Sequence, residues 1–150
     1  MKLEIQIICQ LLIATLLGAL IGLEREIKRK GAGLQTYSLV ALGTCLFTVI
    51  INKLLTEFAG QSGISSDPLR IIQSVAIGIG FIGAGVIFHQ GPDVTGLTTA
   101  AALWVTAGIG VAVGSGQYLL AIFVTAVALF ILVVLGGAEK LIFKRKKSQE

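Results

Sequence analysis

The sequence predicts an all-α integral membrane protein, a bundle of five transmembrane helices with glycine-rich packing. From Val94 to Ala138 the chain runs 45 residues without Asp, Glu, Lys, Arg or His. As a single helix this run would reach about 68 Å, roughly twice the ~30 Å hydrocarbon core of a bilayer. Hydrophobic residues make up 55% of the chain and charged residues 13%, whereas soluble domains carry about 25% charge. The chain is therefore expected to lie in a lipid bilayer, which would be its first partner.

Charge-poor segments mark the five helices in chain order. The long run divides in two at its one central cluster of helix breakers, Gly114-Ser115-Gly116-Gln117. Each resulting segment is near the ~20 residues that span a bilayer. The basic cluster follows the first segment rather than preceding it, so we interpret that segment as a retained helix and not a signal peptide. The predicted helices cover residues 5–23, 31–52, 71–88, 97–113 and 118–135.

The distribution of Lys and Arg predicts the orientation. With five spans, nine basic residues fall on one side and three, Lys2, Lys53 and Arg70, on the other. Because basic residues accumulate in cytoplasmic loops, the N-terminus is expected outside and the C-terminus in the cytoplasm. Residues 1–138 would form the transmembrane domain and 139–150 a short basic cytoplasmic tail. The nine residues are Arg25, Lys28, Arg29, Lys30, Lys140, Lys144, Arg145, Lys146 and Lys147.

Glycine is the expected packing residue, with 19 in 150 positions. Small residues let lipid-embedded helices approach closely, and two GxxxG pairs stand at 18/22 and 110/114. The face of the third helix that carries Gly80 and Gly83 is predicted to contact the fourth helix. The GxGxxG pattern at 78–83 lies mid-span and lacks the preceding strand of a dinucleotide site. The predicted packing set is Gly18, Gly22, Gly78, Gly80, Gly83, Gly85 and Trp104.

Several classes of function are disfavoured. No ionisable side chain lies near the centre of a span, which counts against a pump or a proton relay. His89 is the single histidine, and no catalytic triad or HExxH motif is present, so we expect no enzymatic activity. The net charge of +4 is confined to the flanks of apolar segments, which is typical of membrane topology rather than nucleic-acid binding. The mildly polar side chains within the spans are expected to hydrogen-bond between helices, with a cation path lined by Gln and Thr oxygens as the alternative. They are Gln10, Thr15, Thr44, Thr48, Gln73, Ser74, Thr106 and Thr125.

A polar cluster is predicted at the cytoplasmic face. Two acids end the first helix, although acids at a helix C-terminus oppose the macrodipole, so each should have a partner. Three interpretations stay open: the i, i+4 pairs Glu24–Lys28 and Glu26–Lys30, an ion pair between Arg25 and Asp93, and an Mg²⁺ site with Glu24 and Asp93 as candidate ligands. The predicted cluster is Glu24, Arg25, Glu26, Asp93, Thr98 and Thr99.

A helix-start signature is predicted on the outer face. Asp67 is a suitable N-cap and Pro68 a suitable first helical residue. Arg70 would then lie where the third helix enters the membrane. We expect Asp67 and Arg70 to form an outer-face cap.

Read together, these segments resemble the MgtC/SapB family of bacterial inner-membrane proteins. The resemblance covers most of residues 14 to 110, in order and at matching spacing. The chain departs from the family at Gln35-Thr36-Tyr37, where Arg-Thr-His is usual, so a role that needs charge at positions 35 and 37 does not carry over. The matching stretches are Gly22–Glu26, Ala32–Leu34, Leu39–Gly43, Asp67–Arg70, Gly78–Ile87 and Gly96–Ala107.

The resemblance implies a regulatory membrane protein linked to growth in low magnesium and, in pathogens, to virulence inside host cells. Such a protein would act by helix–helix contacts with itself, as a homodimer or higher oligomer, or with other membrane proteins such as the ATP synthase. The alternative is a magnesium or other divalent-cation transporter or channel. Mg²⁺ is the one cofactor under consideration. Larger family members carry a cytosolic domain after the last helix, which we do not expect here because about 15 residues follow it.

Overall fold

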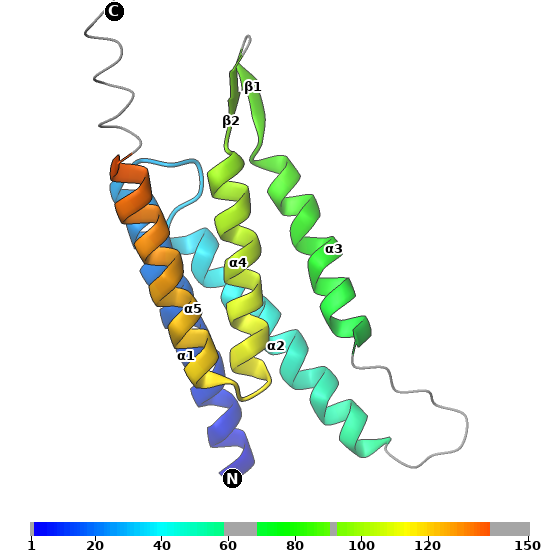
Figure 1. Cartoon of the computed structure of the whole chain (residues 1–150). Coiled ribbons are helices and arrows are strands. Elements are labelled where there is room, and N and C mark those ends of the chain that lie inside the picture. Colours follow the sequence, from blue (N-terminus) through cyan, green and yellow to red (C-terminus); the bar gives the residue numbers. More distant parts are fainter. Residues whose placement is uncertain (1, 59–68, 91–92, 139–150) are drawn as a thin grey trace, which may run out of the picture.

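The computed structural model describes residues 2–58, 69–90 and 93–138. The helices run alternately up and down (Figure 1), and the C-terminal end of the first helix lies at the same end of the bundle as the hairpin and the end of the last helix. We call this the basic end. The elements are α1 (Lys2–Ile27), α2 (Leu34–Glu57), α3 (Leu69–Gly85), β1 (Phe88–Gln90), β2 (Asp93–Thr95), α4 (Leu97–Gly114), α5 (Tyr118–Phe130) and the π-helical segment η1 (Ile131–Leu135).

The all-α membrane fold is confirmed. Within the described residues, four helices are long and apolar enough to cross a bilayer: Leu3–Ile27, Leu34–Glu57, Leu97–Gly114 and Tyr118–Ala138. The apolar part of α3, Ile72–Gly85, is shorter than these four. Membrane crossing by α3, and with it the count of five spans, stays a prediction.

Helix α2 is held between α1 and α4 by glycines. A Cβ at Gly18 would lie 2.6 Å from the Tyr37 carbonyl oxygen, and one at Gly22 would lie 2.8 Å from the Leu34 Cα. On α4, a Cβ at Gly114 would lie 2.8 Å from the Cys45 carbonyl oxygen. Both GxxxG pairs of the sequence therefore lie against α2, where only glycine allows the observed approach.

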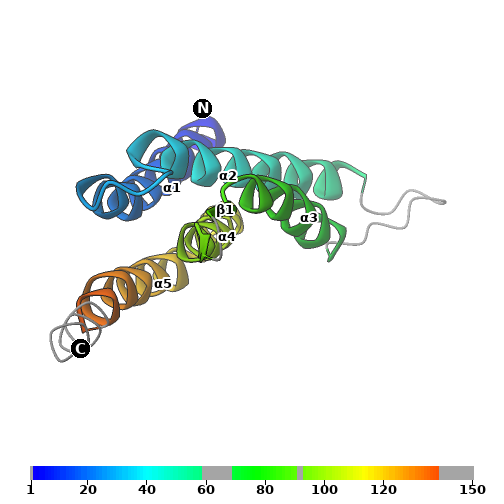
Figure 2. The same cartoon turned by 90° about the horizontal axis from the view of Figure 1, so that it is seen from above.

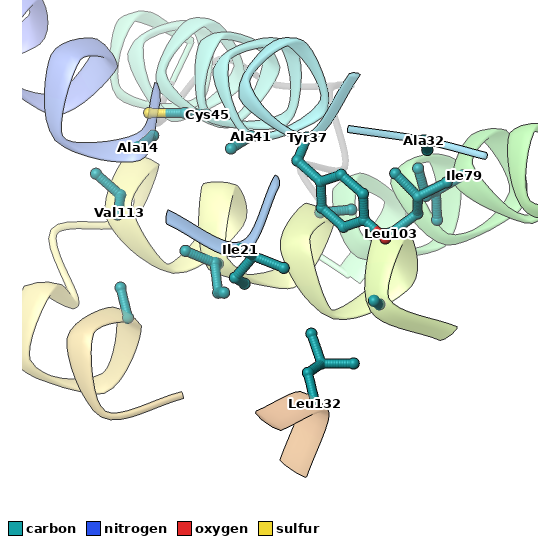
Figure 3. Close-up of a cluster of buried hydrophobic side chains, with 14 of the residues drawn as sticks. Ala14, Ile21, Ala32, Tyr37, Ala41, Cys45, Ile79, Leu103, Val113 and Leu132 are labelled. Carbon is teal, nitrogen blue, oxygen red and sulfur yellow. The ribbon is translucent and has the colours of Figure 1, made fainter. Parts of the chain in front are cut away.

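The buried core lies where α1, α2 and α4 meet. Figure 3 shows the ring of Tyr37 extending from α2 toward Leu103 of α4. Tyr37, Leu103 and Ile21 are each completely buried. Viewed from above, α4 lies centrally, with α5 and α3 on either side of it (Figure 2), and half of its membrane-length window is buried, the highest share among the four candidate spans. Large apolar side chains such as Leu119, 84% exposed, cover the outer surface that lipid would contact.

Helix α3 packs more loosely than sequence analysis predicted. Gly83 lies against α4, where a Cβ would be 3.6 Å from the Cβ of Ala100, an ordinary van der Waals distance. A Cβ at Gly78, Gly80 or Gly85 would meet no atom of the described residues within 4 Å. The expected Gly80 contact with the fourth helix is therefore wrong, because the face of α3 that meets α4 contains Gly83 but not Gly80.

Trp104 also departs from its predicted packing role. Its side chain is 59% exposed, on the part of α4 that the other helices leave uncovered. A large indole fits at such a surface because lipid provides an apolar environment for it. The packing surface of α4 is formed instead by smaller residues, including Thr106 and Ala107.

A β-hairpin connects α3 to α4. Phe88 pairs with Thr95 and Gln90 with Asp93 in antiparallel register, while Gly91 and Pro92 between the strands lie outside the described residues. Gly96 ends the hairpin with φ +90°, and a Cβ there would overlap the carbonyl oxygen of Val86. Only glycine adopts the positive φ and also allows the close approach to Val86, so Gly96 determines how the hairpin joins α4.

Candidate functional site

The candidate site is built around Arg25, which is 3% exposed on the last turn of α1. A buried guanidinium requires partners because its desolvation is costly. Its Nη2 donates a hydrogen bond to Thr99 Oγ1 at 3.3 Å, and its Nη1 lies 3.6 Å from Glu24 Oε2. The Nε is buried and has no hydrogen-bond partner in the described part of the chain.

Thr99 joins three helices at this site. Its hydroxyl accepts the bond from Arg25 on α1, and its carbonyl accepts a hydrogen bond from the Tyr37 hydroxyl on α2 at 3.2 Å. Thr99 belongs to the cluster predicted from the sequence, whereas Tyr37 stood out there only as a departure from the family. Two features of the sequence could have indicated it: Tyr37 is an aromatic residue in the first turns of an apolar helix, and Gly18 and Gly22 offer it space on α1.

Glu24 is paired with Lys28, which follows the end of α1 and bonds the C-terminal segment η1. Its Oε1 lies 2.5 Å from Lys28 Nζ, the expected i, i+4 ion pair. Lys28 Nζ also donates to the carbonyl oxygen of Leu132 at 2.6 Å. That carbonyl lies in the π-helical segment η1, a type of irregularity that often occurs at functional sites. Lys28 thereby links Glu24 to η1 across more than one hundred residues of sequence.

Glu26 has a partner that its spacing did not predict. Its Oε2 accepts a hydrogen bond from the backbone N–H of Leu34 at 2.7 Å, so it caps the first turn of α2. A carboxylate at a helix N-terminus is favoured by the macrodipole. A Cβ at Gly33 would lie 2.5 Å from that oxygen, so glycine leaves room for the cap. The expected Glu26–Lys30 ion pair does not form among the described residues.

The remaining predicted members are not brought into this cluster. Asp93 and Thr98 are exposed, on β2 and on the first turn of α4, and no ion pair joins Asp93 to Arg25 in the described ranges. Those ranges also contain no group of three or more His, Cys, Asp or Glu side chains that could hold a metal ion. Arg70 is exposed near the start of α3. Asp67 and the basic tail at 139–150 lie outside the described residues.

The sequence profile of the MgtC family matches residues 11–141. The chain belongs to the MgtC family. The matched range contains the whole Arg25 cluster, and the cluster also draws on the family-like stretches that begin at Gly22 and Gly96. No solved structure matches this chain.

Three curated relatives show how far this membership extends. Protein MgtC of Salmonella typhi is 43% identical over 143 residues, which are 95% of this chain and 58% of that protein. Protein SapB of Bacillus subtilis (strain 168) is 45% identical over 113 residues, 75% of this chain and 49% of that protein. Putative magnesium transporter YhiD of Escherichia coli (strain K12) is 40% identical over 129 residues, 86% of this chain and 60% of that protein. This MgtC family chain thus spans about half to three fifths of the length of these relatives.

At the other end of the MgtC family bundle, two amides cap α4. Gln10 Nε2 of α1 donates to the carbonyl oxygen of Val113 at 3.1 Å, and Asn52 Nδ2 of α2 donates to that of Gly114 at 3.3 Å. The last carbonyls of a helix lack partners within it. These two contacts therefore stabilise the α4 terminus between α1 and α2.

Of the polar side chains expected to bond between helices, Gln10 does so, but the threonines of that set, all within helices, do not. Their hydroxyls donate to the carbonyl one turn earlier on the same helix, as in Thr48 to Thr44, Thr106 to Ala102 and Thr125 to Ala121. A hydroxyl within a helix competes for that nearby carbonyl. Because these donors are satisfied locally, they supply no bond between helices.

Proposed function

We propose that this multi-pass bacterial membrane protein is a regulator that acts through helix–helix contacts with a second copy or with a partner membrane protein. One observation supports the proposal most strongly: at three glycines of α3 an added Cβ would point into open space, away from every described residue. A Cβ at Gly78, Gly80 or Gly85 would meet nothing within 4 Å. Small residues at a lipid-facing surface allow another helix to approach closely.

A groove between α2 and α3 adds to this surface. It has a volume of about 680 Å³, and its walls are almost entirely apolar. Phe47 and Val40 of α2 line one side, and Gly78 and Ile82 of α3 line the other. Phe81 of α3, 85% exposed, lies beside it on the outer surface. A transmembrane helix of a partner would bury these groups without displacing any contact within the chain.

The test is to fill the open face of α3. Gly80→Leu should leave folding intact, because the added side chain enters open space, and should abolish activity in a growth assay at low magnesium. Gly108→Leu is the matched control, since Gly108 of α4 also has no neighbour within 4 Å. Full activity of the Gly80 variant at normal abundance would remove α3 as the contact surface.

The partner would be the ATP synthase or another copy of the chain, and this part of the proposal rests on the family resemblance. Chemical cross-linking from Gly80→Cys in membranes, followed by identification of the linked protein, would distinguish the two. In this proposal the chain catalyses no reaction of its own.

A magnesium transporter or channel is the second candidate. The name of the Escherichia coli relative, putative magnesium transporter, favours it. Purified protein in liposomes that contain a fluorescent magnesium indicator would show uptake if this candidate is correct. The regulator proposal requires that no uptake occurs above the rate of protein-free liposomes.

We also propose that the N-terminus lies outside and the basic end faces the cytoplasm. The nine-to-three division of Lys and Arg supports this orientation. Gly31→Cys, near the basic end, and Ser115→Cys, between α4 and α5, can each be labelled after replacement of Cys9 and Cys45. A membrane-impermeant maleimide should label position 115 in intact spheroplasts and position 31 only after lysis. The reverse pattern would overturn the orientation.

A further inference from the structure

The basic end contains a second cavity that the cluster around Arg25 does not explain. It has a volume of about 700 Å³ and lies between the end of α1, the start of α4 and the end of the α5–η1 helix. We call it the basic pocket. Its walls include Arg25, Lys28, Lys30, Thr98, Ile131 and Leu135.

The pocket carries an excess of positive charge. Three cationic side chains line it, and no carboxylate does so among the described residues. Glu24 neutralises part of this charge through Lys28 and Arg25. The ammonium of Lys30 forms no ion pair or hydrogen bond within the described ranges, and the guanidinium of Arg25 lines the pocket beside it. The Lys30 ammonium would gain from a bound anion.

The first turn of α4 contributes backbone donors to the same wall. Leu97, Thr98 and Thr99 all line the pocket. The N-cap residue is Gly96, which has no side chain to cap these N–H groups, and the first helical bond runs from Ala100 N to Gly96 O. Free N–H groups together with the positive end of the macrodipole favour a phosphate at such a position.

The rest of the wall is apolar and continuous with the outer surface. Val94, Ile131 and Leu135 line this part, and Ile131 and Leu135 are about half exposed on the side that faces lipid. The bundle ends here, at the depth where headgroups lie. A cationic half beside an apolar half fits a molecule with a phosphate at one end and a hydrocarbon chain at the other. A soluble anion would leave the apolar half without a partner.

We propose that the basic pocket binds an anionic phospholipid. The headgroup phosphate lies between Lys30, Arg25 and the first turn of α4, and an acyl chain lies along Ile131 and Leu135. Basic pockets between transmembrane helices bind the headgroups of anionic lipids in the same way. The site is independent of the α3 surface, so it holds whether or not the proposed regulator function is correct.

Native mass spectrometry of the full chain in detergent tests this proposal with two added lipids. Phosphatidylglycerol should bind more tightly than phosphatidylcholine of the same chain length. Lys30→Gln should weaken phosphatidylglycerol binding about fivefold, the effect of one basic residue near an anionic surface. Arg29→Gln is the matched control, because Arg29 is an adjacent cation that does not line the pocket; it should leave the affinity unchanged.

Three results would overturn the proposal. The first is equal affinity for the two lipids, and the second is equal loss in the Lys30 and Arg29 variants, which would indicate general surface charge. The third is complete displacement of the lipid by millimolar glycerol phosphate, which would make this a site for soluble phosphates. A further variant, Leu135→Asn, distinguishes a lipid from a soluble phosphate. It should weaken phosphatidylglycerol binding, since it removes apolar contact with the acyl chain.

Discussion

Four of the five glycines of α1 and α4 lie against α2, Gly108 being the exception, whereas a Cβ at three of the four glycines on α3 would meet open space among the described residues. In the sequence these regions look alike, since each is an apolar helix with glycines at helical spacing. The two regions differ in which atoms lie opposite their glycines. A Cβ at Gly18 or Gly22 would meet the backbone of α2 at Tyr37 and Leu34, while a Cβ at Gly80 would meet no atom of the described residues within 4 Å.

This comparison separates two uses of the same residue. Where glycine removes a Cβ that would touch backbone, it holds the fold together, and no other residue fits. Where glycine leaves open space, the fold does not require it, and a close approach by another molecule can use it. The spacing of small residues therefore marks faces that can pack closely, but not whether the neighbour belongs to the same chain.

The largest expected effect is at Gly110. A Cβ there would overlap Thr44 Oγ1 and lie 2.5 Å from the Ala41 carbonyl oxygen, so Gly110→Leu forces α2 and α4 apart. We expect a loss of more than about 3 kcal/mol in the free energy of unfolding, at the upper end for overpacking. Thermal unfolding in detergent, followed by circular dichroism, measures it. Gly108→Leu, two residues away, should unfold like the unchanged protein; equal melting of both variants would refute the comparison.

A smaller loss of stability is expected at Arg25, the buried charge of the region where α1, α2 and α4 pack. Arg25→Ala leaves Thr99 Oγ1 without its donor and Glu24 with Lys28 as its one remaining cation. An unsatisfied buried polar group costs about 1–3 kcal/mol, and the thermal midpoint should fall accordingly. Asp93→Ala is the contrast, because its side chain is exposed and should affect stability little. The low-magnesium growth assay then shows whether either residue is needed for function at normal abundance.

Much of this fold could be predicted from charge alone. The charge-poor segments at 71–88 and 97–113 correspond to the helices α3 and α4, because a charged residue is costly on an apolar helix that meets lipid. The hairpin could not be predicted, since it depends on Gly96 approaching Val86 at the end of the neighbouring helix. Helix α1 continues beyond the predicted Leu23 to Ile27, where its charged residues find partners.

The candidate site was predictable only where its contacts are local. The Glu24–Lys28 pair follows from i, i+4 spacing. The cap of α2 by Glu26 and the bond from Lys28 to Leu132 depend on how α1 meets other segments, which spacing along one helix does not specify. Gln10 and Asn52 are a similar case, because the carbonyls that they cap belong to α4.

The smallest effect tests the boundary between the two regions. At Gly83 an alanine Cβ would lie 3.6 Å from the Cβ of Ala100, a favourable contact distance. Gly83→Ala should therefore change the free energy of unfolding by less than about 1 kcal/mol, the scale of a glycine-to-alanine exchange in a helix. Chemical unfolding in mixed micelles resolves a change of this size. Gly18→Ala is the control, since its Cβ would lie 2.6 Å from a backbone oxygen and should destabilise the protein clearly. A clear loss at Gly83 as well would show that α3 packs on α4 as tightly as α1 packs on α2, and the open face of α3 would then be part of the core.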